Sequence, residues 1–284
     1  MRRIKLLALD IDGTILTVNK KLTLRTEAAI RSAIGQGISV VLVTGRPFCG
    51  IPTELLSIPG IDYVITSNGA VTTDLHQHKT IRKANIDAET AISILQVPRK
   101  YNLIHAVFIN GIGYCEKDSF ERHLKLIEGK AIVSYIRQSR RIISCLDDLI
   151  LTAPHGVENI WFIVIEPQLR QKLYRMIPEH WNVRAVNTSQ TDIEVGNYLA
   201  DKGYAISELA RQIGISRDRI LAVGDSGNDI GMLQSAGISV AMGNAEEEIK
   251  SIADYITDTH EEDGAAKVIE HVLFGDLDHL KKRK

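Results

Sequence analysis

Short apolar runs that alternate with helical stretches constrain the fold of this chain more than any other feature. The runs LLAL (6–9), SVVLV (39–43) and DYVIT (62–66) have the continuous apolar character of strands buried on both faces. Residues 23–36, between the first two runs, have a helical pattern with Leu24, Ala28, Ala29 and Ile34 on one side. The alternation returns after about residue 201. It predicts right-handed crossovers and an α/β fold with a Rossmann-like, doubly wound parallel sheet.

The middle of the chain has a different pattern. HAVFING (105–111) and GYCE (113–116) are candidate hairpin strands with almost no residues between them, and further strand and helix patterns follow. Strands that pair with their neighbours in sequence indicate an α+β module. We therefore expect residues 1–85 and 193–284 to form a catalytic core and residues 86–192 to form an inserted α+β cap domain.

Polar side chains follow the apolar runs at the points where the strands end. Asp10 and Asp12 follow the first run, Thr44 follows the second, and Asp225 follows ILAV (220–223). Because ligands of doubly wound sheets bind at the carboxyl ends of the strands, this convergence predicts an active site at one edge.

The acidic residues of this edge favour a divalent metal ion. Residues i and i+2 of a strand share a face, so Asp10 and Asp12 are expected to point the same way with Cα atoms roughly 7 Å apart. Two such close anions require either a cation or a raised pKa. Asp225 and Asp229 in GDSGND add carboxylates at the same edge. Mg²⁺, held by carboxylates and a substrate phosphate, suits these ligands.

Three further residues offer the groups that bind phosphate. Thr44 supplies a hydroxyl group, Gly45 supplies open backbone N–H groups at a turn, and Lys202 supplies a positive charge at the start of a helix. Together with the metal ligands, they indicate phosphoryl transfer rather than acyl transfer.

The ordered motifs DIDGT, VTGR, KG and GDSGND resemble the four motifs of the haloacid dehalogenase (HAD) superfamily. The long insertion between the second and third motifs is similar in size and position to the large cap of the Cof-type phosphatases. The resemblance covers residues 4–84 and 193–273. One departure is that the proline often found before the motif lysine is missing from IEVGNYLADKG.

The resemblance implies a role for each site residue. Asp10 would be the nucleophile that forms an aspartyl-phosphate, and Asp12 would be the general acid and then the general base. The remaining implied roles are phosphate binding by Thr44, Gly45, Lys202 and Asn228, metal binding by Asp10, Asp225 and the backbone carbonyl of Asp12, and support of the metal site by Asp229.

These implications predict a phosphatase that hydrolyses a small phosphorylated metabolite, either a sugar phosphate or a cofactor or nucleotide phosphate. A large cap that closes over the site would exclude macromolecules and water. Two alternatives stay open: a phosphomutase of the same superfamily, and a catalytically silent regulatory or binding protein.

The composition excludes other classes of protein. Lys and Arg total 34 and Asp and Glu total 35, so the chain lacks the basic character of a general nucleic-acid binder. No stretch approaches the roughly 20 apolar residues that span a bilayer. Cys49, Cys115 and Cys145 have no metal-binding spacing, and together with the lack of a leader they predict a reducing, cytoplasmic location. The oligomeric state has no signature in the sequence.

Overall fold

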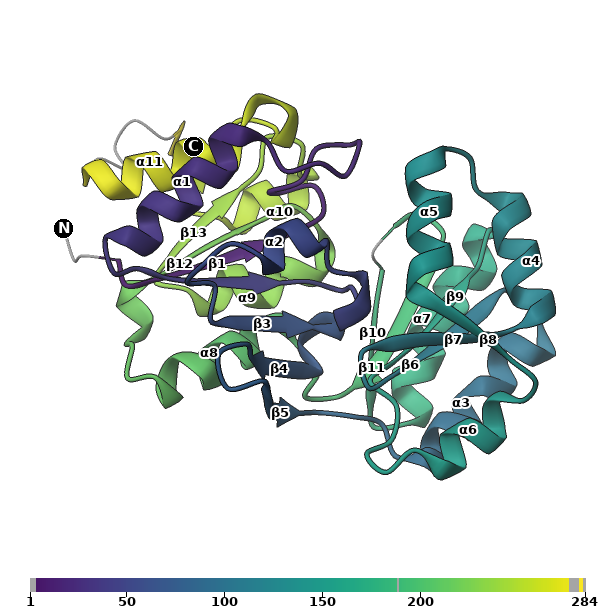
Figure 1. Cartoon of the computed structure of the whole chain (residues 1–284). Helices are drawn as coiled ribbons and strands as arrows, with labels where there is room; N and C mark the ends of the chain where they lie inside the picture. Colours follow the sequence, from purple (N-terminus) through teal and green to yellow (C-terminus); the bar gives the residue numbers. More distant parts are fainter. Residues whose placement is uncertain (1–3, 188, 276–280, 283–284) are drawn as a thin grey trace.

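The structure, a computed structural model, describes residues 4–187, 189–275 and 281–282 and contains two sheets that lie side by side (Figure 1). The first sheet has the order β15-β14-β13-β12-β1-β2-β3-β4-β5, and the strands from β14 to β3 are parallel. Its strands are β1 (Leu6–Asp10), β2 (Ser39–Val43), β3 (Tyr63–Thr66), β4 (Val71–Asp74), β5 (Lys79–Lys83), β12 (Ile220–Gly224), β13 (Ile238–Ala241), β14 (Tyr255–Ile256) and β15 (Lys281–Lys282).

Helices cover both faces of the first sheet, which is the doubly wound arrangement predicted from the sequence. The α-helices are α1 (Leu24–Gly35), α2 (Thr53–Leu56), α8 (Lys202–Gln212), α9 (Ile230–Ser235), α10 (Glu247–Ile252) and α11 (Gly264–Phe274). Leu7 and Leu9 of β1 pack with α1, α2 and α11 on one face, whereas Leu6 and Ala8 pack with α8, α9 and α10 on the other. Alternate residues of one strand are therefore buried on opposite faces, which explains the continuous apolar runs.

The side of the helix predicted to be apolar is only partly buried: Ala29 is buried and Ile34 is half-buried, but Leu24 and Ala28 are exposed. Leu24 is 86% exposed, and the buried residues of α1 include Ala29, Ile30 and Ala33. Their spacing of three to four residues defines the face that packs on the sheet and on α11. The predicted start of the helix is confirmed, since the Thr23 hydroxyl caps it by accepting a hydrogen bond from the backbone N–H of Thr26.

The second sheet has six strands in the order β10-β11-β9-β6-β7-β8, and all its neighbours are antiparallel except the β7–β8 pair. Residues 110 and 111 join β6 to β7 with positive φ angles, as in a two-residue Asn-Gly hairpin turn. The strands are β6 (His105–Ile109), β7 (Ile112–Glu116), β8 (Arg140–Ile143), β9 (Asn159–Ile163), β10 (Val183–Val186) and β11 (Asp192–Asn197).

The two faces of the second sheet have different surroundings. Its helices are α3 (Ala88–Lys100), α4 (Lys117–Leu126), α5 (Lys130–Ser139), α6 (Leu146–Thr152) and α7 (Pro167–His180). Val107 and Ile109 of β6 pack against α3, α6 and α7. The alternate residues Ala106 and Phe108 form a smaller cluster with Trp161 and with Phe120 of α4. This second face is only partly covered by helices, and it borders the cavity described below.

The predicted α/β fold with an inserted α+β part is confirmed, but the return to the first sheet was placed too early. Strand β11 pairs with β9 and β10, although most of it lies beyond residue 192. Its alternating apolar residues Ile193 and Val195 fit either sheet, so the pattern did not separate them. The side chain of Asn197 donates a hydrogen bond to the carbonyl of Asn85, which ties the two connecting segments together. We propose residues 86–197 as the cap domain.

The two edges of the first sheet carry antiparallel strands. Strands β4 and β5 form a hairpin at one edge of the first sheet, and β15 pairs antiparallel with β14 at the other. Helix α11 follows β14 in the chain. Among the described residues, no helix is both long and apolar enough to cross a bilayer.

Candidate active site

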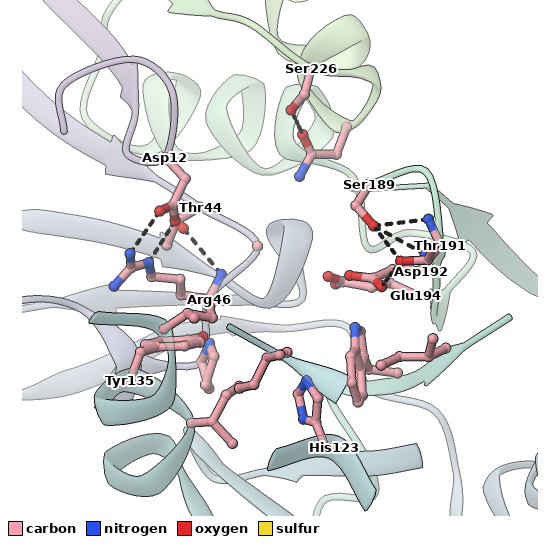
Figure 2. A pocket seen from close by; sticks show the side chains of 18 of the residues that line it. Asp12, Thr44, Arg46, His123, Tyr135, Ser189, Thr191, Asp192, Glu194 and Ser226 are labelled. Carbon is pink, nitrogen blue, oxygen red and sulfur yellow. Dashed lines mark hydrogen bonds and ion pairs between the residues drawn. The ribbon is translucent and has the colours of Figure 1, made fainter. Parts of the chain in front are cut away.

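The ends of β1, β2 and β12 meet beside a cavity of about 680 Å³ between the two sheets. Figure 2 shows Asp12 and Thr44 on one side of it and His123 and Tyr135 on the other. The predicted site residues that line the cavity are Asp10, Asp12, Thr44, Gly45, Asp225 and Asn228. Lys202 and Asp229 lie behind them and are almost fully buried.

Lys202 joins two of the predicted carboxylates. Its Nζ atom lies 2.7 Å from Oδ1 of Asp10 and 2.7 Å from Oδ1 of Asp229. Lys202 is the first residue of α8, and the side chain of Asp201 caps this helix. Burial opposes the charge of Lys202, but the two carboxylates outweigh it and raise the pKa of the ammonium group. The missing proline therefore does not keep this lysine from the site.

Asp229 holds the loop that carries Asp225. Its Oδ2 atom accepts hydrogen bonds from the backbone N–H groups of Asp225, at 2.9 Å, and of Ser226, at 3.0 Å. Around Asp225 itself, Thr14 donates to Oδ1 at 3.5 Å and Asn244 donates to Oδ2 at 3.3 Å. Asp229 therefore uses its oxygens on protein groups, whereas the Asp225 carboxylate remains at the cavity wall.

Gly13 gives the Asp225 carboxylate its space. Its φ angle is +80°, and a Cβ atom at this position would lie 2.2 Å from Oδ2 of Asp225. Both the backbone conformation and the close contact require a residue without a side chain. The glycine of DIDGT thus lets the loop after β1 pack against the loop after β12.

The carboxylates at this edge fit a divalent cation. Oxygen atoms of Asp10, Asp225 and Asp229 lie within 4.8 Å of one another, and Lys202 can neutralise only one of the three charges. Burial, with the charge of Asp229 next, raises the pKa of Asp10 well above its usual value and that of Asp225 to about 7. Oδ2 of Asp10 is buried without a hydrogen-bond partner among the described residues. A hard cation would satisfy this atom and keep the carboxylates ionised.

Asp12 binds Arg46 and Lys20, whereas Asp10 binds Lys202. Arg46 donates hydrogen bonds to the Asp12 carboxylate from Nε at 2.6 Å and from Nη2 at 2.7 Å, and Lys20 donates another at 2.7 Å. Burial favours the neutral acid, but these cations outweigh it and lower the pKa of Asp12. β1 ends at Asp10 and Asp12 lies in the following turn, so the strand geometry that predicted a shared direction for the two side chains does not extend to Asp12.

The remaining predicted residues surround the end of β2. Thr44 is buried, and its hydroxyl accepts a hydrogen bond from the backbone N–H of Arg46. A Cβ atom on Gly45 would lie 2.9 Å from Oδ1 of Asn68. The side chain of Asn228 donates to this same oxygen at 2.9 Å. Thr44, Gly45 and Asn228 therefore lie together, as the sequence predicted.

Asn68 also contacts the inserted part of the chain. Ser67 and Asn68 both have positive φ angles, a conformation that costs energy in residues other than glycine. The Asn68 side chain donates to Glu194 of β11 at 2.5 Å, and the Ser67 hydroxyl donates to the buried Glu158 at 2.9 Å. Two carboxylates of the inserted part, Glu194 of β11 and Glu158 just before β9, thus hold this turn.

The sequence did not predict that Arg46 and Lys20 contact Asp12. It also did not predict which residues of the inserted part line the cavity. Arg46 could have been found from its place in VTGR, beside two phosphate-binding candidates. Lys20 follows no motif. Trp161 also lines the cavity, although no motif marks it as a cavity residue.

Known proteins match this chain in sequence and in structure along almost its whole length. The model of a family described as haloacid dehalogenase-like hydrolase matches residues 7–269. Phosphatase YwpJ of Bacillus subtilis (strain 168) is 32% identical over an alignment that covers 95% of this chain and 100% of that protein. The 5-amino-6-(5-phospho-D-ribitylamino)uracil phosphatase YcsE of the same strain is 28% identical over 94% of this chain and 95% of its own. A solved haloacid dehalogenase-like hydrolase from B. subtilis superposes with a TM-score of 0.84 at 31% identity, over 94% of this chain and 99% of that structure.

Proposed function

This chain belongs to the haloacid dehalogenase-like hydrolase family, and we propose that it is a Mg²⁺-dependent phosphatase that hydrolyses small phosphate monoesters through an aspartyl-phosphate. The unpartnered Oδ2 atom of Asp10 is the observation that carries this proposal. It is a carboxylate oxygen at a strand end, beside a cavity, with no other use among the described residues.

In the first step, an Asp10 oxygen attacks the phosphorus atom while the bond from phosphorus to the leaving oxygen breaks. Asp12 gives its proton to that oxygen, so an alcohol departs and an aspartyl-phosphate remains. In the second step, Asp12 takes a proton from water, whose oxygen attacks phosphorus and restores the Asp10 carboxylate. The products are the alcohol and inorganic phosphate, and proton transfer of this kind typically accelerates a reaction about 10²–10⁴-fold.

Asp10, Asp225 and the backbone carbonyl of Asp12 would hold Mg²⁺, with Asp229 fixing the Asp225 loop. When bound, Mg²⁺ supplies positive charge that offsets the negative charge of the phosphoryl group and the carboxylates. Lys202 favours the ionised form of Asp10 and holds the carboxylate in place through its 2.7 Å contact. Thr44, Gly45, Lys202 and Asn228 would bind the phosphoryl oxygens.

Small-molecule substrates are proposed because the second sheet borders the cavity on the side opposite the strand ends. The relative YcsE is named for a ribitylaminouracil phosphate, which is a phosphate ester of this size class. A cytoplasmic location is supported by the three cysteines, which are all free thiols in the structure.

The test is release of inorganic phosphate from a panel of sugar, nucleotide and cofactor phosphates in Mg²⁺, without any bisphosphate activator. Excess chelator should abolish the release, and restored Mg²⁺ should return it. Turnover that requires a bisphosphate activator would indicate the mutase, and absence of turnover on every ester would indicate a silent binding protein.

A further inference from the structure

The cavity wall formed by the second sheet is mainly apolar. Phe108, Trp161 and Ile163 form one cluster on this face of the sheet, and all three line the cavity. Leu126 of α4 and Ile165 after β9 also line it, and they leave 44% and 63% of their surfaces exposed. A bare sugar ring placed on this cluster would bury hydroxyl groups against carbon atoms, which is unfavourable. A flat apolar ring would instead cover exposed apolar surface. Thr191, Asp192 and Glu194 also line the cavity, but they belong to β11 and the segment before it.

Arg140 is a buried cation within this wall. Its guanidinium carbon lies 4.4 Å from the ring centre of Phe108 and 5.6 Å from that of Trp161, and the residue is 7% exposed. It forms no ion pair with a carboxylate of the described residues. Its one side-chain hydrogen bond there runs from Nη1 to the hydroxyl of Ser139 at 3.3 Å, and Nε is buried without an acceptor. Because Arg140 lines the cavity and its guanidinium makes one hydrogen bond to the described residues, it has N–H donors left for the acceptor atoms of a ligand.

His123 adds a second polar group beside Arg140. Its ring is 4.7 Å from the ring centre of Trp161, and its nitrogen atoms form no hydrogen bond with a described residue. Burial, and then the charge of Arg140, lower the pKa of His123 to about 4. At neutral pH the imidazole is therefore uncharged, with one donor nitrogen and one acceptor nitrogen.

On the premise that the chain is the phosphatase argued above, we propose that its substrate is a phosphate monoester whose leaving group ends in a planar heteroaromatic ring. The ring lies on the wall of Phe108 and Trp161, and acceptor atoms at its edge bind Arg140. Arg140 is thus a specificity-determining residue, since it meets the far end of the substrate and not the phosphoryl group. Bare sugar phosphates lack both features.

The experiment compares kcat/KM for flavin mononucleotide and pyridoxal 5′-phosphate with kcat/KM for glucose 6-phosphate and ribose 5-phosphate. Acetyl phosphate serves as the reference, because its leaving group is too small to reach the wall. We expect the better ring ester to exceed the sugar phosphates on the order of 100-fold. Arg140→Ala should lower kcat/KM for that ester roughly 10- to 100-fold, the loss expected for a hydrogen bond to a charged group.

Acetyl phosphate hydrolysis by Arg140→Ala should stay within about twofold of wild type, since the strand ends are unchanged. The matched control is Arg141→Ala, which removes the next arginine along β8, an exposed residue outside the cavity lining. Arg141→Ala should leave kcat/KM unchanged for every substrate. Equal kcat/KM for ring and sugar esters would overturn the proposal. An equal loss on acetyl phosphate would show that Arg140 acts only through the fold.

If acetyl phosphate and all esters are inert, the proposed function fails, but the wall is still tested by binding. Flavin mononucleotide is then titrated calorimetrically into Asp10→Asn, which cannot form the phosphoenzyme. Measurable binding that weakens about tenfold or more with Arg140→Ala added would support the ring site. Absence of binding, or binding that is indifferent to Arg140, would overturn it.

Discussion

Arg46 forms two parallel hydrogen bonds with the carboxylate of Asp12, from Nε at 2.6 Å and from Nη2 at 2.7 Å. The same guanidinium lies 4.7 Å from the ring centre of Tyr135 on α5. One cation of the first sheet therefore touches both the proposed general acid and the inserted part of the chain. Because a charged partner favours the carboxylate, Arg46 opposes the protonated form that the acid needs.

The first prediction concerns Arg46→Met. Without the guanidinium, burial should raise the pKa of Asp12, so that the acid keeps its proton to higher pH. For alkyl phosphates, the pH above which kcat/KM declines should then move upward, whatever happens to the maximal rate. The measurement is the pH profile of kcat/KM on glycerol 2-phosphate. Arg46→Lys retains the charge and should move the decline less, and an unmoved decline in Arg46→Met would contradict the coupling.

The second prediction concerns Gly13→Ala. The new Cβ atom would collide with the carboxylate of Asp225, so this proposed metal ligand must move. We expect the Mg²⁺ concentration for half-maximal activity to rise on the order of 10- to 100-fold, the size typical of a disturbed metal site. Gly37→Ala is the matched control, because its φ of +74° gives the same backbone strain with no atom within 4 Å of the new Cβ. Equal effects of both substitutions would attribute the loss to backbone strain alone.

The sequence predicted the site better than it predicted the cavity wall. Asp10, Thr44 and Asp225 each follow a strand of one parallel sheet, and topology alone brings such ends together. The partner of Asp12 was not predictable in this way, because the reach of Arg46 depends on where the turn after β1 places the carboxylate. The role of Trp161 was not predictable either, because the sequence pattern of β9 does not distinguish a residue that lines a cavity from a residue of the core.

The third prediction concerns stability below neutral pH. An unfolded histidine binds a proton below about pH 6.5, whereas His123 in the fold binds one only near pH 4. Its contribution to the free energy of unfolding is therefore complete above pH 6.5 and is lost as the pH falls toward 4, by at most about 3 kcal/mol. His123→Phe retains a ring beside Trp161. In this variant the free energy of unfolding, measured with urea, should change less between pH 6.5 and pH 4 than in the wild type. His155→Phe, at an exposed site, should keep the wild-type slope, and an unchanged slope in His123→Phe would contradict the assignment.

The last prediction separates Asp10 from Asp12, whose carboxylates bind different cations. As the nucleophile, Asp10 cannot be replaced by an amide, so Asp10→Asn should eliminate turnover and leave no trapped phosphoenzyme. Asp12→Asn should slow alkyl esters by about 10²–10⁴-fold and aryl esters much less, because a phenolate leaves without a proton. The measurement is kcat for both variants on p-nitrophenyl phosphate and glycerol 2-phosphate, with acid trapping of the acyl-phosphate. Equal losses of Asp12→Asn on both esters would exclude it as the leaving-group acid, and a phosphorylated Asp10→Asn protein would place the nucleophile elsewhere.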